Sequence, residues 1–162
     1  MKPGGGKAKG SAFEREICKK LSLWISKGKR VDCLWRSAMS GGRATVQRKS
    51  GVDIRQAGDI CSVSPEGHAL TDLYYIETKS YRNLAIDRFI ILQQGQLEKF
   101  WRETKKQARR YGKRPLLIAK QNGMPTLLIT DRALYSTATP LVPGPVFTIY
   151  TLDEVLAKEC WL

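Results

Sequence analysis

Apolar residues recur every three or four positions near the start of the chain, at Phe13, Ile17, Leu21 and Trp24. This spacing is typical of an amphipathic helix. Ser11 and Glu14 have the arrangement of a capping box, in which a hydroxyl precedes a carboxylate by three residues. The pattern therefore predicts a helix that begins at Ser11 and ends near residues 26–28.

Short apolar runs bounded by turn residues predict strands in the rest of the chain. They cover residues 31–35, 59–63, 70–79, 116–120, 126–130 and 146–151. Residues 64–68, Ser-Pro-Glu-Gly-His, are expected to form the turn of a hairpin between 59–63 and 70–79. Helical spacing returns over 95–111 and over 152–158, whereas 37–58 has few apolar residues and fits a loop or a long basic hairpin.

This order of elements indicates an α/β fold, in which a mixed central β-sheet is flanked by helices. The length of 162 residues fits one domain with a substantial core. Residues 1–10 are rich in glycine and lysine, and we expect them to form a flexible basic tail. The domain is then expected to span residues 11–162.

The charge balance indicates a polyanionic partner. The chain holds 28 Lys and Arg against 15 Asp and Glu, a net charge of +13, and nucleic acid is the commonest polyanion that such a protein binds. No apolar run approaches membrane-spanning length, and the first ten residues lack the apolar segment of a secretory signal. We therefore expect a cytoplasmic location, in the host cytoplasm if a phage encodes the protein. The four cysteines are widely spaced without a C-x-x-C pair, which favours reduced, mostly buried thiols.

Charged residues interrupt the end of the apolar strand predicted over 70–79. Side chains alternate along a strand, so Glu77 and Lys79 share one face. Antiparallel pairing with the preceding strand would place Asp59 opposite them. Carboxylate oxygens are ligands that Mg²⁺ prefers, and a lysine can orient or deprotonate a water, so the trio suits phosphodiester hydrolysis. The alternative is that Glu77 and Lys79 form a solvated ion pair on an edge strand.

Glu14 is a further candidate for this chemistry. It lies at helical spacing with Ile17 and Leu21, at the edge of the helix face that is expected to pack on the sheet. From there its carboxylate could reach a metal site, directly or through a water. A role in helix capping alone is the alternative.

Four segments occur in an order that resembles a known family: Lys9–Glu16 (KGSAFERE), Trp35–Gly41 (WRSAMSG), Gly58–Ile60 and Glu77–Lys79. They are similar to the successive motifs of archaeal Hjc-type Holliday junction resolvases, which belong to the PD-(D/E)XK nuclease superfamily. The similarity covers residues 9–130. It implies a restriction-endonuclease-like core, a homodimer, and Mg²⁺-dependent hydrolysis of branched DNA in recombination and repair, with Mn²⁺ able to replace Mg²⁺.

The resemblance also implies roles for single residues. Asp59, Glu77 and Glu14 match the metal-binding carboxylates, and Lys79 matches the catalytic lysine. Two further matches concern DNA: Arg36 corresponds to a basic residue near the scissile phosphate, and Ser40 lies in a loop that approaches the substrate. Asp53 competes with Asp59 for the aspartate role, and we prefer Asp59 because the strand-like residues 60–63 follow it directly.

Basic residues flank the expected metal site in three regions: the tail, the 43–55 segment and the 99–114 helix. We expect their contacts to DNA phosphates to include Arg43, Arg48, Lys49, Lys105 and Arg109. Phosphate contacts fix affinity and register but read no bases, so we expect selectivity for DNA structure rather than for sequence.

Two alternative functions share this fold. Gln107 and Tyr111 have the Q-x-x-x-Y form found in RecB-like nucleases, and they lie about one turn apart on a helix. That form favours a RecB-like or restriction-like nuclease acting on DNA ends or flaps. A catalytically inactive DNA-binding module is the second alternative.

Overall fold

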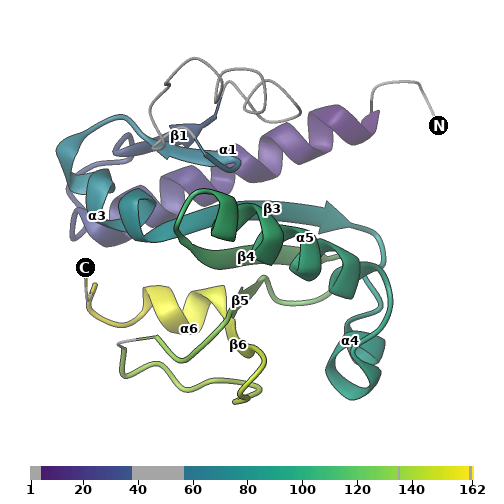
Figure 1. The fold of residues 1–162 in the computed structure, drawn as a ribbon. Coiled ribbons are helices and arrows are strands. Elements are labelled where there is room, and N and C mark those ends of the chain that lie inside the picture. Colours follow the sequence, from purple (N-terminus) through teal and green to yellow (C-terminus); the bar gives the residue numbers. More distant parts are fainter. Residues whose placement is uncertain (1–4, 38–56, 135, 161) are drawn as a thin grey trace.

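The computed structural model describes residues 5–37, 57–134, 136–160 and 162, with the backbone alone for 5–8. Figure 1 shows the arrangement of its helices and strands. In chain order they are α1 (Gly5–Ile25), β1 (Leu34–Arg36), β2 (Ile60–Ser62), α3 (Pro65–Leu73), β3 (Tyr74–Tyr81), α4 (Ile86–Leu92), α5 (Gln96–Arg110), β4 (Arg114–Gln121), β5 (Leu127–Thr130), β6 (Thr148–Thr151) and α6 (Leu152–Leu156).

The strands form a four-stranded mixed sheet and a smaller two-stranded one. In the larger sheet the order is β3-β4-β5-β6, with β3 parallel to β4 and the other two pairs antiparallel. In the smaller sheet β1 and β2 are antiparallel, and Arg36 lies opposite Ile60. The expected α/β fold with a mixed sheet flanked by helices is confirmed.

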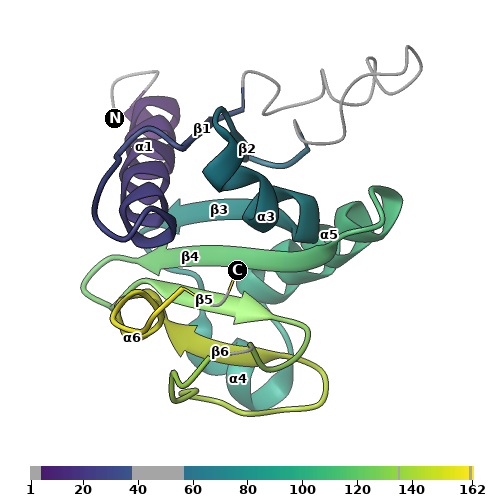
Figure 2. The same ribbon diagram turned by 90° about the vertical axis from the view of Figure 1, so that its left-hand side faces the viewer.

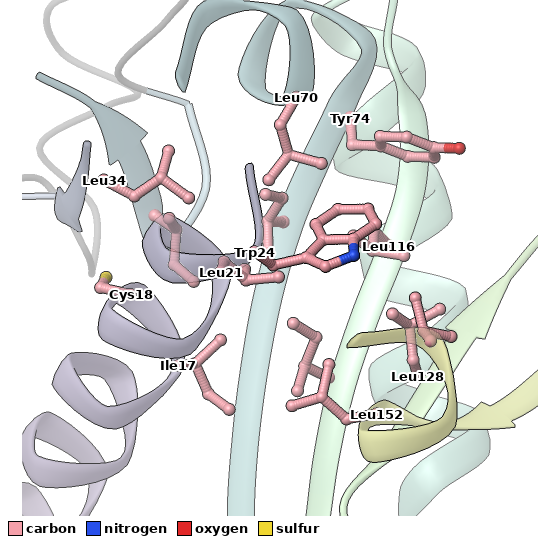
Figure 3. Packing of buried hydrophobic residues seen from close by; sticks show 14 of the residues in the cluster. Ile17, Cys18, Leu21, Trp24, Leu34, Leu70, Tyr74, Leu116, Leu128 and Leu152 are labelled. Atoms are coloured by element: carbon pink, nitrogen blue, oxygen red, sulfur yellow. The ribbon is translucent and has the colours of Figure 1, made fainter. Parts of the chain in front are cut away.

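Helices cover both faces of the larger sheet, as the two views in Figures 1 and 2 show. Successive residues of β4 point to opposite faces. Leu116 and Ile118 belong to a core with residues of α1, β3 and α6, whereas Leu117 and Ala119 pack with residues of α4 and α5. Figure 3 shows the first of these cores, in which Trp24 lies among leucines of several elements. The sheet is therefore buried on both sides, and Glu77 and Lys79 of its edge strand β3 are only partly buried.

A helix start and a turn were predicted wrongly. The expected start at Ser11 is wrong, because α1 already begins at Gly5 and Ser11 lies inside the helix, where it cannot be the N-cap. The expected hairpin turn at 64–68 is also wrong, because α3 begins there with Pro65 in its first turn. Proline suits both a turn and the first turn of a helix, because in neither place is its missing N–H needed.

The relation of β2 to β3 differs from the predicted antiparallel hairpin. Because a helix connects the two strands, the chain returns in the same direction, and Gly58 forms a parallel bridge with Ile76. The N–H of Asp59 donates to the carbonyl of Ile76 at 2.8 Å. Gly58 has a φ of +90°, and a Cβ atom on it would lie 2.5 Å from that carbonyl oxygen. Only glycine allows the chain to approach β3 this closely.

Two further sequence predictions can be compared with the structure. Cys18, Cys33 and Cys61 are buried and Cys160 is partly exposed, and all four are free thiols, as expected. Across the described ranges, no helix combines the length and the apolar character that a membrane span requires.

Candidate active site

Asp59 is fixed at the edge of β3. The side chain is buried, and its Oδ2 accepts hydrogen bonds from the backbone N–H of Thr78 at 2.8 Å and from the Thr78 hydroxyl at 3.2 Å. Among the described residues, both hydrogen bonds to this carboxylate end on the same oxygen. The arrangement orients Asp59 and leaves Oδ1 for another ligand.

Glu77 and Lys79 project from the same face of β3, as their spacing predicts. The Lys79 ammonium donates to Glu77 Oε1, and the Tyr75 hydroxyl donates to Glu77 Oε2 at 3.2 Å. The two charged side chains are 19% and 23% exposed, so they form a largely buried pair that solvent still reaches. Tyr75 is itself supported by Tyr111, whose ring stacks on it with centroids 5.9 Å apart.

The charges of these groups are strongly linked. Burial, and after it the nearby Asp59 carboxylate, raise the pKa of Glu77 above its usual value. Burial alone would lower the pKa of Lys79, but the charge and hydrogen bond of Glu77 outweigh it, so the pKa of Lys79 is raised. Two carboxylates therefore lie close enough to repel each other, and one ammonium only partly compensates for them.

This donor set fits a divalent cation with hard-oxygen preference. Mg²⁺ is commonly bound through one or two carboxylates and keeps several waters, which substrate phosphates replace. Asp59 and Glu77 supply two such carboxylates, and a bound cation would offset the burial and the repulsion from Asp59 that together raise the pKa of Glu77. In the part of the chain that the structure describes, no three Asp, Glu, His or Cys side chains gather as a metal site.

Glu14 lies outside this pair and contacts Arg36. Its Oε2 accepts from Arg36 Nε at 2.8 Å, and the Glu14 side chain is 15% exposed. Arg36 ends β1 opposite Ile60, and the N–H of Ser37 donates to the carbonyl of Asp59 at 2.7 Å. The ion pair between Glu14 and Arg36 therefore joins α1 to the end of β1, which is hydrogen-bonded to Asp59 through Ser37. The structure does not bring Glu14 together with Asp59 and Glu77, and its role as a metal ligand stays a prediction.

The structure describes only some of the residues that are predicted to contact DNA. Lys105 and Arg109 are on α5, with the Lys105 ammonium 5.5 Å from the centre of the Trp101 ring and Arg109 exposed. Four others lie in the part of the chain that the structure does not describe: Ser40, Arg43, Arg48 and Lys49. Asp53, the competitor of Asp59, also lies outside the described residues.

Sequence reasoning missed the two side chains that hold the carboxylates, Tyr75 and Thr78. For Tyr75 a signal existed, because it lies two residues before Glu77 and so shares its face of the strand. For Thr78 none existed, since its contact with Asp59 depends on which edge of β3 the chain approaches. The side chains of Gln107 and Tyr111 have different partners in the structure: Gln107 donates to Glu103 at 2.6 Å, whereas Tyr111 packs on Tyr75.

Comparison with known proteins assigns the chain to a family. Residues 5–155 match the sequence model of the family described as "Phage putative PDDEXK endonuclease". Neither the curated proteins nor the solved structures gave a match to the chain. The matched segment includes Asp59, Glu77 and Lys79. The chain belongs to this phage PD-(D/E)XK endonuclease family.

Proposed function

We propose that the protein is a Mg²⁺-dependent DNA endonuclease that hydrolyses phosphodiester bonds in branched DNA, with four-way junctions as the preferred substrate. The observation that carries the proposal is the meeting of Asp59, Glu77 and Lys79 at the edge of β3. Family membership supports the nuclease class. The preference for junctions rests on the four motifs that resemble archaeal junction resolvases.

Asp59 and Glu77 would hold the Mg²⁺ ion, and Mn²⁺ would be able to replace it. When bound, such an ion stabilises negative charge on a phosphate and lowers the pKa of a bound water. Thr78 and Tyr75 each fix one oxygen of these carboxylates, so both side chains are oriented before substrate arrives. This arrangement avoids reorganisation during the reaction.

Lys79 acts as a hydrogen-bond donor and charge partner in this proposal. Because its pKa is raised, the side chain is an ammonium at neutral pH. In that form it orients the attacking water or a phosphate oxygen by donating a hydrogen bond, and it does not remove a proton. Its contact with Glu77 keeps the ammonium beside the metal-binding carboxylates.

The proposal includes a homodimer, because symmetric cutting of a junction needs two active sites. Glu14 would contribute through an outer or second-metal contact once DNA is bound. The proposal also includes a cytoplasmic location, which agrees with the four free thiols.

A second candidate is a nuclease acting on DNA ends or flaps. The observation that favours it is the stacking of Tyr111 on Tyr75, which connects the Q-x-x-x-Y helix to Glu77. A panel of labelled four-way junctions, flaps and linear duplexes, incubated with the protein and Mg²⁺, separates the two. Faster cleavage of the junction supports the resolvase proposal, whereas faster cleavage of flaps or ends supports the second candidate. Binding without cleavage of any substrate would show an inactive DNA-binding module.

A further inference from the structure

A hollow of about 370 Å³ opens where α5 leads into β4. The ends of several elements form its wall, and the connection between α5 and β4 can be followed in Figure 2. The lining residues come from the end of α3, the exposed side of α5, the start of β4 and the segment after β5: Asp72, Leu73, Lys105, Arg109, Gly112, Lys113, Arg114, Pro115, Asp131 and Arg132.

The wall of this hollow is strongly cationic. It contains five Lys and Arg side chains but only two carboxylates, which leaves an excess of three positive charges. Cations that face one hollow repel one another, and an anion placed among them removes that repulsion. The charge of the wall therefore favours an anionic ligand.

Two of the cations are fixed in the structure. Arg114 donates to Asp131 Oδ1 at 3.0 Å and to the Tyr74 hydroxyl at 3.2 Å, and its side chain is 12% exposed. Lys113 is buried and donates to the carbonyl of Thr71. Both positions are set by the protein before any ligand binds, so they form a rigid part of the wall.

Three other cations are accessible at the rim. Lys105 and Arg109 lie one turn apart on α5 and so project from the same side of the helix. The Arg132 side chain is 65% exposed and lies 3.8 Å from Asp131 Oδ2. Long side chains that reach solvent in this way can close on a phosphate that enters the hollow.

Two tyrosines lie between the hollow and the candidate active site. Gly112, which lines it, directly follows Tyr111, and the Tyr111 ring stacks on Tyr75, whose hydroxyl donates to Glu77. A continuous path of contacts therefore links the hollow to Glu77.

We propose that this hollow binds a backbone phosphate of the DNA substrate other than the phosphate that is cut. The inference rests on the proposed function for the identity of the substrate, and it adds a second phosphate site formed by α5, β4 and the segment after β5. Its role is to fix the position of the strand relative to Glu77. Phosphate contacts of this type supply affinity that depends on salt but not on base sequence.

The test measures DNA affinity in EDTA, where no cleavage takes place, as a function of salt concentration. The double variant Arg109→Ala/Arg132→Ala removes two exposed rim cations. The control, Arg88→Ala/Arg102→Ala, removes two exposed arginines from α4 and α5 that do not line the hollow. If one phosphate contact is lost, the slope of log K against log salt should fall by about 0.9 in the rim variant, and it should stay unchanged in the control.

Equal slopes in the two double variants would overturn the proposal. So would a rim variant that binds DNA like the control but loses saturable binding of inorganic phosphate, because the hollow would then take a free phosphate. Failure of the proposed function is a separate result: a wild-type protein that cuts no substrate, while the rim variant still loses its phosphate contact in EDTA, leaves this inference standing.

Discussion

Gly58 controls how closely the chain before Asp59 approaches β3, and replacing it tests that packing. In Gly58→Ala the new Cβ would lie 2.5 Å from the carbonyl oxygen of Ile76 and 3.2 Å from its nitrogen, at a φ of +90°. Gly28→Ala is the matched control, because Gly28 has a φ of +80° but a Cβ added there would meet no atom within 4 Å.

The two variants share the cost of a positive φ and differ in the clash. A side chain in the left-handed region costs about 1–2 kcal/mol, and this cost applies to both positions. Forcing an additional methyl group into a closely packed site costs about 1–3 kcal/mol more, and only Gly58→Ala meets such a site. The free energy of unfolding should therefore fall by about 1–3 kcal/mol more in Gly58→Ala than in Gly28→Ala.

Urea unfolding followed by circular dichroism measures the loss in free energy of unfolding for each of the two variants. In a protein of this size, each kcal/mol corresponds to roughly 2–4 °C of Tm, so thermal unfolding provides a second readout. Because the clash lies next to Asp59, Gly58→Ala should also lose cleavage activity, while Gly28→Ala keeps it. Equal losses of stability in the two variants would refute the close approach of Gly58 to Ile76.

Two further predictions concern the groups around Glu77. Tyr75→Phe removes the hydrogen bond to Glu77 Oε2, so the free energy of unfolding should fall by about 1 kcal/mol. We also expect weaker Mn²⁺ binding by calorimetry and half-maximal cleavage at a higher Mg²⁺ concentration. Unchanged metal binding would contradict the role given to Tyr75. The second concerns pH, because burial and Asp59 raise the pKa of Glu77 in the folded state. Protonated Glu77 therefore stabilises the fold fully below the pKa of the unfolded chain, and this contribution is lost as the pH rises through the pKa of the folded protein. Urea midpoints in EDTA should therefore decrease over that interval in the wild type and lose this component in Glu77→Gln, and identical pH profiles would show that Glu77 has no raised pKa.

Much of the fold follows from local sequence patterns. The apolar spacing of α5 and the apolar runs of β4 and β5 are determined by neighbouring residues, so these elements were predicted close to their observed positions. The helix α1 was also predicted, but it begins earlier than expected, at Gly5. The helix α4 was not predicted. Its two ends are in the left-handed conformation at Ala85 and Gln93, residue types that give no signal for it.

The candidate site was predictable in composition but not in geometry. The sequence indicated that Asp59 would meet Glu77 and Lys79, yet it assigned the wrong direction to the strand pairing. Ser64-Pro65 suits a turn as well as a helix start, and only packing decides between the two. A Cβ on Gly67 would lie 2.8 Å from the carbonyl oxygen of Cys33, so α3 packs tightly on the residues just before β1. The ion pair of Glu14 with Arg36 joins residues 22 positions apart, and no local sequence pattern predicts such a contact.

The most direct test of the central claim is cleavage of a labelled four-way junction in Mg²⁺ by the wild type and by the single variants Asp59→Ala and Glu77→Ala. DNA binding in EDTA serves as the control for folding. We predict that the wild type cuts the junction and that each variant is slower by at least about a hundredfold, because each loses one of two carboxylates that hold the metal, while its DNA affinity is kept. Variants that bind and still cut at the wild-type rate would show that Asp59 and Glu77 are not the metal-binding pair.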